Sequence, residues 1–94
     1  MTVHVMATMR VTNPEYLTKY REQAGDALTR HGGSVVQASG SLAILEGEAE
    51  APGMAALLAF PDEQSARAWI DDPDLAGVHE LRRASGQSEV LMLA

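Results

Sequence analysis

Residues 3–14 have the sequence VHVMATMRVTNP, and this stretch decides how the fold begins. Apolar and polar side chains alternate over residues 3–11, and a repeat of two is typical of a β-strand with one apolar face. Asn13 and Pro14 then mark the start of a helix, because Asn is a favourable N-cap and Pro loses no needed hydrogen bond in a first turn. The stretch therefore predicts a strand followed at once by a helix.

The predicted helix continues to the pair Gly32-Gly33. Large or apolar side chains recur at spacings of three and four from Tyr16 to His31, which indicates one buried stripe. Glycine ends helices because it can take the left-handed conformation. We expect His31 to be structural, since the helix dipole favours a histidine in the last turn.

The middle of the chain predicts three β segments. Residues 34–38 form a short strand, residues 39–41 have turn chemistry, and residues 42–48 are expected to return as the second strand of a hairpin. Residues 54–60 are apolar throughout and lie between a turn and Pro61, which favours a buried central strand.

The last third predicts a second helix and a closing strand. Asp62 is a suitable N-cap, and Asp72-Pro73 ends the helix. Its inner stripe is Ala66, Trp69 and Ile70. Leu75, Val78 and Leu81 suggest one or two further helical turns, an irregular appendage before a strand at residues 88–94.

This order, β-α-β-β-α-β with one extra strand, predicts a single α+β domain over residues 1–94. The arrangement is a ferredoxin-like antiparallel sheet with two main helices on one face. The other face is left bare, and an exposed apolar face usually marks an interface. We therefore expect a homodimer that forms through the open sheet face.

Composition excludes several classes of partner and site. The chain has 13 acidic residues against 7 Lys and Arg, a formal charge of −6, which disfavours nucleic acid and an anionic membrane surface. The chain has no cysteine, so disulfides, a thiolate nucleophile and cysteine-based metal sites are excluded. Without a signal peptide or a stretch of membrane-spanning length, we expect a cytoplasmic protein. The three histidines form no local metal motif, so we expect no metal and no bound cofactor.

Several short motifs, in this order and spacing, carry a resemblance to a known family. They are Val11-Thr12-Asn13-Pro14-Glu15, Gly32-Gly33, Leu45-Glu46-Gly47, the run FPDEQSARAW at residues 60–69, Asp72-Pro73-Asp74-Leu75 and Leu81-Arg82. Together they resemble the domain of unknown function 1330 family over essentially the whole chain. The resemblance implies a ferredoxin-like dimeric α/β barrel, in the wider company of antibiotic-biosynthesis monooxygenases, muconolactone isomerases and chlorite-dismutase-like proteins. It implies no settled activity.

Two groups of residues are candidates for catalysis. His4, Thr8 and Arg10 share one face of the first strand. There His4 could act as a base and Arg10 could hold a carboxylate or enolate; alternatively these residues line the sheet interface or reach solvent. In barrels of the resembled kind, the segment at residues 75–82 can edge a pocket. His79 is then a candidate base and Arg82 a candidate oxyanion partner, although His79 could equally be a surface histidine.

Tyr20 and Trp69 are candidates for substrate binding. Each could stack on a flat organic ligand, yet both lie on the buried stripes of their helices and could simply belong to the core.

Two functions stay open on this basis. The first is a cofactor-independent small-molecule enzyme of the oxygenase, isomerase or cyclase type. The second is a non-catalytic metabolite-binding or accessory dimer. Function follows sites rather than folds, so the resemblance does not choose between them.

Overall fold

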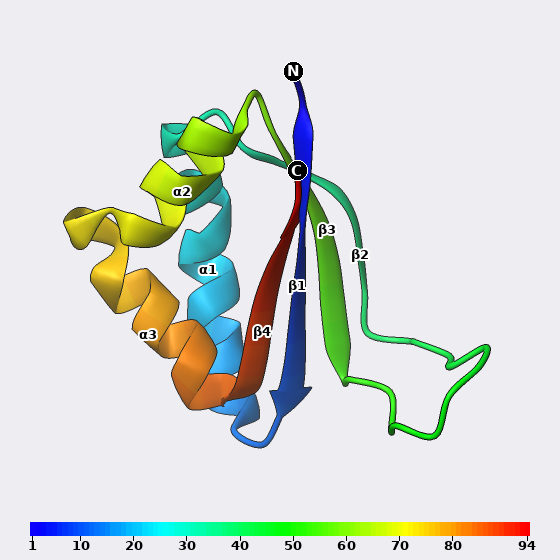
Figure 1. Cartoon of the computed structure of the whole chain (residues 1–94). Helices are drawn as coiled ribbons and strands as arrows, with labels where there is room; N and C mark the ends of the chain where they lie inside the picture. Colours follow the sequence, from blue (N-terminus) through cyan, green and yellow to red (C-terminus); the bar gives the residue numbers. More distant parts are fainter.

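A four-stranded antiparallel sheet with three helices on one of its faces makes up the computed structural model, which describes all of residues 1–94 (Figure 1). The elements follow one another as β1 (Val3–Val11), α1 (Pro14–Arg30), β2 (Ser34–Ser39), β3 (Met54–Phe60), α2 (Glu63–Asp71), the 3₁₀ turn η1 (Pro73–Leu75), α3 (Ala76–Ser85) and β4 (Gly86–Leu93). The strands lie in the order β2-β3-β1-β4. This is the predicted ferredoxin-like α+β fold.

Strand β1 shows how the sequence pattern sets the two layers. It pairs with β3 on one side and β4 on the other, so it lies inside the sheet. Its buried side chains face the helices and are Val3, Val5, Ala7 and Met9. The alternate positions, from His4 to Arg10, lie on the opposite face, which no element of the chain covers (Figure 1). We call this second surface the open face.

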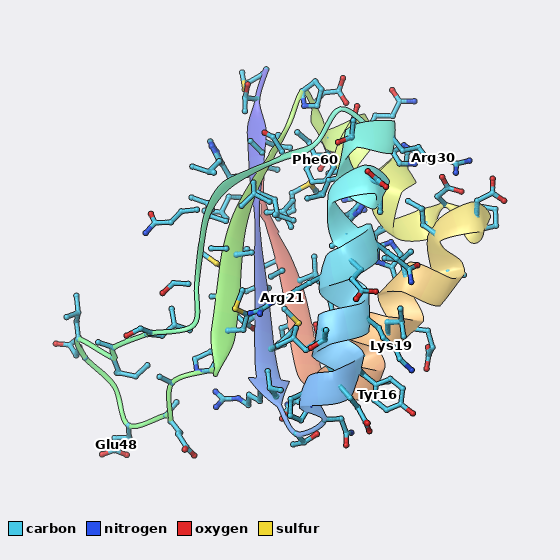
Figure 2. All side chains as sticks on the ribbon, turned by 180° about the vertical axis from the view of Figure 1, so that it is seen from behind. Tyr16, Lys19, Arg21, Arg30, Glu48 and Phe60 are labelled. Atoms are coloured by element: carbon cyan, nitrogen blue, oxygen red, sulfur yellow. The ribbon has the colours of Figure 1, made fainter.

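The core lies between the sheet and the helices. Phe60 from β3 and Trp69 from α2 are 1% and 2% exposed, and their ring centroids are 5.4 Å apart. Figure 2 shows Phe60 lying between the sheet and the helical layer. The apolar alternation of β1 and the stripes of the two predicted helices thus meet in one cluster.

The predicted helix ends are largely confirmed. Gly32 has a φ of +73°, the left-handed conformation expected after a helix, and the Gly33 amide donates to the carbonyl of Leu28 at 2.8 Å. The Asp62 carboxylate accepts from the Ser65 amide at 2.7 Å, as a helix cap does. Asn13 makes no such cap; its side-chain amide donates to the carbonyl of Ala84 at 3.0 Å and ties the start of α1 to the end of α3.

The expected strand over residues 42–48 is wrong. The partner of β2 is β3 itself, with Ser39 opposite Ala55, so the hairpin returns twelve residues later than the turn chemistry suggested. Residues 40–53 form a long connection with no helix or strand. There is accordingly no extra strand in the sheet.

The irregular appendage is also a correction, because residues 76–85 form a complete third helix of ten residues. The physical reason is the chemistry of its inner face. Besides Val78, the buried residues of α3 are His79, Arg82 and Ser85, three polar side chains that an apolar pattern cannot detect.

None of the helices combines the length and the apolar character that crossing a membrane requires.

Candidate functional site

The inner face of α3 carries a buried polar cluster. His79, Arg82 and Ser85 are spaced at three residues and therefore lie on one side of the helix. They are 1%, 3% and 0% exposed. Buried polar groups of this kind need hydrogen-bond partners, so their partners define what the cluster can do.

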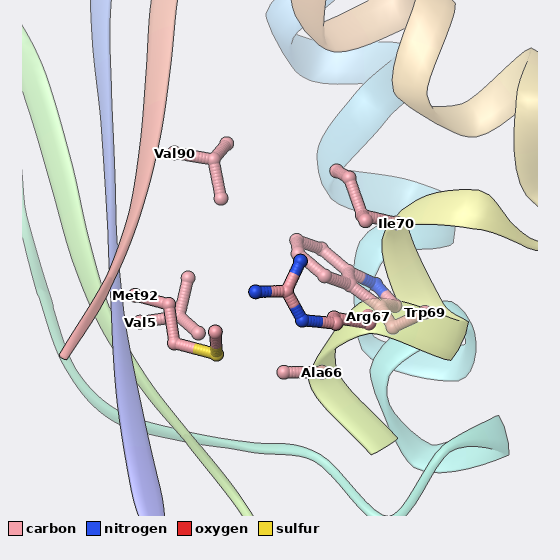
Figure 3. A pocket seen from close by; sticks show the side chains of 7 residues that line it. All are labelled: Val5, Ala66, Arg67, Trp69, Ile70, Val90 and Met92. Carbon is pink, nitrogen blue, oxygen red and sulfur yellow. The ribbon is translucent and has the colours of Figure 1, made fainter. Parts of the chain in front are cut away.

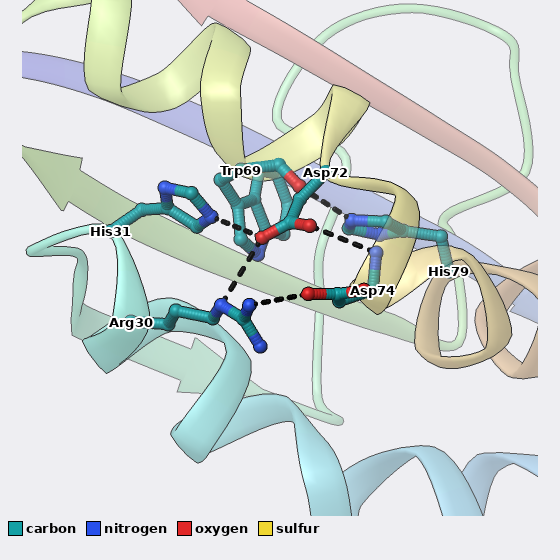
Figure 4. Close-up of polar contacts among 6 residues, drawn as sticks. All are labelled: Arg30, His31, Trp69, Asp72, Asp74 and His79. Carbon is teal, nitrogen blue, oxygen red and sulfur yellow. Dashed lines mark hydrogen bonds and ion pairs between the residues drawn. The ribbon is translucent and has the colours of Figure 1, made fainter.

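Both ring nitrogens of His79 are engaged. Nε2 lies 2.9 Å from the carbonyl oxygen of Trp69 (Figure 4). Nδ1 lies 2.6 Å from Nη1 of Arg82. A carbonyl oxygen only accepts and a guanidinium only donates. Nε2 therefore carries the hydrogen, and the lone pair of Nδ1 receives the hydrogen bond from Arg82.

The surroundings of His79 keep it neutral. Burial lowers the pKa of His79 below its ordinary value, the hydrogen bond to the Trp69 carbonyl opposes this, and the Arg82 charge lowers the pKa further. The Trp69 ring packs edge-on against the imidazole, with centroids 4.8 Å apart and planes at 82°. A neutral imidazole with an unprotonated Nδ1 can accept a proton once the hydrogen bond from Arg82 is released.

Arg82 is a buried cation without a carboxylate partner. None of the ion pairs of the chain includes it, whereas Arg30, Arg67 and Arg83 each pair with an acid. Its Nε donates to the Ser88 hydroxyl at 3.2 Å. Its Cζ lies 5.9 Å from the ring centroids of both Tyr20 and Trp69. Burying an uncompensated charge is costly, so this guanidinium is suited to receive an anionic or enolate oxygen.

Two cavities between the helices and the sheet adjoin this cluster. The larger, about 300 Å³, is bounded by α1 and by β1, β2 and β3; eleven of its thirteen lining residues are hydrophobic, and Tyr20 is one of the thirteen. The smaller, about 180 Å³, lies between α2 and strands β1 and β4, and Trp69 lines it with Val5, Val90 and Met92 (Figure 3). Tyr20 and Trp69 thus each contact both Arg82 and a cavity.

The structure brings together four of the six predicted site residues and leaves two apart. His79, Arg82, Tyr20 and Trp69 lie within one cluster. His4 and Arg10 point to the open face, on the other side of the sheet. Neither His79 nor Arg82 lines a cavity directly, and Trp69 is at the same time part of the core.

A second polar network ties α1 to the corner between α2 and α3 (Figure 4). The Asp72 carboxylate lies 2.8 Å from Nε2 of His31 and 3.2 Å from Nε of Arg30, and it accepts from the Asp74 amide at 2.9 Å. The His31 hydrogen bond, and after it the Asp74 amide, lower the pKa of Asp72. His31 is therefore structural, as expected. The network fixes the corner that follows Trp69, whose carbonyl holds His79.

Sequence reasoning missed Asp72 and Ser88 as members of these networks. Asp72 was interpreted only as a helix stop, and nothing in its neighbourhood indicates that His31, 41 residues earlier, would reach it. Ser88 is the third residue of β4 and carries no signal of its own. No three His, Cys, Asp or Glu side chains are grouped so that they could hold a metal ion.

These features define the class of protein as a ferredoxin-like α+β domain with a polar cluster and cavities between its sheet and helices. The chain belongs to the family described as domain of unknown function 1330 (DUF1330), whose model matches residues 2–94. This confirms the resemblance carried by its motifs. No curated protein sequence matches the chain.

Solved structures share the fold over nearly the whole chain. A protein of unknown function from Rhodopseudomonas palustris is similar at 21% identity, with 98% of this chain and 80% of that chain covered and a TM-score of 0.78. SnoaB, a cofactor-independent oxygenase from Streptomyces nogalater, is similar at 15% identity, with 99% and 91% covered and a TM-score of 0.71. A dimeric ferredoxin-like protein of unknown function from Jannaschia sp. CCS1 is similar at 15% identity, with 100% and 99% covered and a TM-score of 0.70. At these identities the likeness is one of fold.

Proposed function

We propose that the protein is a cofactor-independent enzyme that binds a small, planar, largely apolar molecule in the 300 Å³ cavity and acts on an enolisable group of it. One observation carries the proposal. A buried guanidinium that no carboxylate neutralises, that of Arg82, is held by a neutral histidine and lies against Tyr20, which also lines the cavity. The cofactor-independent oxygenase SnoaB shares the fold, which makes this chemistry a reasonable one for the scaffold.

The proposed roles follow from the hydrogen bonds. For a ligand in the cavity to reach Arg82, the Tyr20 ring has to move aside. A ligand oxygen that accepts from Nη1 of Arg82 then replaces Nδ1 of His79 as the acceptor, and Nδ1 becomes free. His79 takes a proton from a carbon whose anion is conjugated with the ligand carbonyl, and Arg82 stabilises the resulting enolate. Returning the proton to another carbon is an isomerisation; reaction of the enolate with dioxygen is an oxygenation.

A specific observation favours a second candidate, a non-catalytic metabolite-binding dimer. Both nitrogens of His79 are occupied, and neither His79 nor Arg82 lines a cavity. In this case His79 and Arg82 hold the helical layer together, and the cavity binds its ligand without reaction.

Anthrone separates the candidates, because it is planar, apolar and enolisable. Under nitrogen in deuterium oxide, proton abstraction appears in NMR spectra as exchange of the hydrogens on its reactive carbon. In air, one anthrone and one dioxygen give one anthraquinone and one water, and the absorbance of the quinone reports the oxygenation. We expect both signals to exceed those of protein-free buffer. Thermal stabilisation by anthrone without either signal would support the non-catalytic dimer, and no stabilisation at all would contradict both candidates.

Variants locate the reaction. Arg82→Gln is expected to remove the catalysed exchange while Arg83→Gln, a matched change at the exposed neighbour that pairs only with Glu80, leaves it intact. Arg82→Lys, which keeps the charge, serves if the glutamine variant does not fold. Ala24→Phe fills the larger cavity from α1 and is expected to abolish binding. Equal activity of the Arg82 and Arg83 variants would contradict the assigned roles.

We further propose that two copies pair through the open face. This face exposes Leu91 and Leu93 of β4, at 58% and 60%, beside Met6 of β1 and Leu57 of β3. An apolar sheet face of this kind is poorly covered by water. His4 and Arg10 then belong to the interface instead of the active site. Light scattering is expected to give twice the chain mass of 10.0 kDa, and a single chain mass at every concentration would contradict the dimer.

A further inference from the structure

The connection between β2 and β3, residues 40–53, is unlike any other part of the molecule; we call it the arm. It makes no backbone–backbone hydrogen bond, although backbone groups normally find partners. It leaves the sheet on the side away from the helices, which is the side of the open face (Figure 1). Glu48 marks its outer end in Figure 2, far from the helical layer.

The apolar side chains of the arm are not buried by their own chain. Leu45 is 98% exposed and Ile44 is 45% exposed. Leu42 packs on the sheet, in a hollow of about 170 Å³ that Met6 and Leu57 also line. The arm thus presents two branched apolar side chains on the same side as the exposed leucines of β4. Both surfaces lose unfavourable hydration if they bury each other.

The arm is acidic, and the open face carries one charge of the opposite sign and one of the same sign. The arm carries Glu46, Glu48 and Glu50 and no Lys or Arg. None of these glutamates forms an ion pair, and neither does Arg10, although Glu50 lies across a hollow from it. On the open face, Arg10 has the opposite sign, whereas Glu89 of β4, which pairs with Thr8, has the same sign as the arm. The fit of the arm to the open face of a second copy is therefore mainly apolar, with Arg10 as the cation available to one of its glutamates.

We propose that the arm of each protomer folds over the open face of a second copy, with Leu45 as its anchor against the exposed leucines and the backbone of residues 42–46 hydrogen-bonded to the free edge of β4 in the partner. The two-fold axis of such a dimer makes the exchange reciprocal, so each contact is formed twice. Residues 42–48 then form, between two chains, the strand pairing that their sequence pattern predicts. They cannot form it within one chain, because no strand edge is available to them there. This inference rests on the proposed homodimer and goes beyond it, since a dimer can form through the sheets alone.

Isotope-filtered NMR on a mixture of ¹³C-labelled and unlabelled chains tests the contact. We expect nuclear Overhauser effects between the Leu45 methyl groups of one chain and open-face side chains, such as Leu91 or Leu93, of the other. A dimer that shows intermolecular effects from the sheet leucines but none from Leu45 would overturn the arm proposal and leave the dimer standing. A monomeric wild-type protein would overturn the dimer itself, and the arm proposal with it.

A variant series checks the energetic role of the arm. Leu45→Asp is expected to raise the dimer dissociation constant at least about tenfold, as loss of an anchor does. Ala68→Asp places the same charge on the exposed outer surface of α2, and Leu45→Met keeps the apolar volume. Both should stay within about twofold of wild type on the same scale. Equal effects of Leu45→Asp and Ala68→Asp would contradict an anchoring role.

Discussion

The two faces of β1 differ in what their side chains require. On one face, Val5 and its neighbours are closed off by the helices, next to a buried polar cluster and two cavities. On the other face, His4 and Arg10 lie among leucines that nothing in the chain covers. One strand of nine residues thus separates the candidate ligand site from the candidate partner surface. The comparison teaches that polarity alone does not locate a ligand site. The buried polar residues are candidates for such a site because they are enclosed. The polar residues of the open face are not enclosed and are therefore not candidates.

Truncation should affect the two faces very differently. Phe60→Ala removes a 1% exposed ring from the covered face and is expected to lower the free energy of unfolding by about 3–5 kcal/mol. Leu93→Ala on the open face should change the free energy of unfolding by no more than about 0.5 kcal/mol. Urea unfolding in a Leu91→Arg background, chosen to prevent dimerisation, measures both. Similar losses from the two variants would break the distinction between the faces.

Two glycines of the helical layer should respond in opposite directions to alanine. Gly86 joins α3 to β4 with a φ of +154°, and a Cβ there would overlap the Arg10 carbonyl. Gly86→Ala is therefore expected to cost about 1–3 kcal/mol in free energy of unfolding. Gly77 lies in α3 with no atom within 4 Å of an added Cβ, so Gly77→Ala should stabilise the protein by about 0.5 kcal/mol. Thermal unfolding of both variants tests this, and a destabilising Gly77→Ala would be inconsistent with the geometry.

A smaller effect should appear on acidification, and it should come from the covered face. The folded protein holds the pKa of His79 below its ordinary value, so the unfolded chain binds more protons once the pH falls below about 6.5. The free energy of unfolding is then expected to fall between pH 7 and pH 5. Urea titrations of His79→Gln should show a flatter pH dependence than those of wild type. Identical slopes for wild type and His79→Gln would contradict a neutral buried His79.

Strong periodic signals gave a correct account of the layers. The alternation of β1, the stripe of α1 with Gly32 at its end and the cap at Asp62 all describe local chemistry that does not depend on distant residues. These signals were enough for the ferredoxin-like order of elements.

The errors and omissions have a common cause in long-range pairing. Residues 42–48 have β character, but β2 already pairs with β3, and no free strand edge lies beside that segment in its own chain. Helix α3 was underestimated because its inner face is polar, and those polar side chains are stable there only through Trp69, Tyr20 and Ser88. His79 and Arg82 are site candidates through the family resemblance and their residue types, but their mutual hydrogen bond is a product of the helix. The network of Asp72 with His31 needed the tertiary structure.

Sedimentation velocity of two matched charge substitutions tests the separation of the faces most directly. Leu91→Arg places a charge on the open face, and Ala68→Arg places the same charge on the exposed outer surface of α2. We expect wild type and Ala68→Arg to sediment with twice the chain mass of 10.0 kDa and Leu91→Arg to sediment as a single chain. If Leu91→Arg sediments as a dimer, or if Ala68→Arg is the variant that dissociates, the open face is not the partner surface.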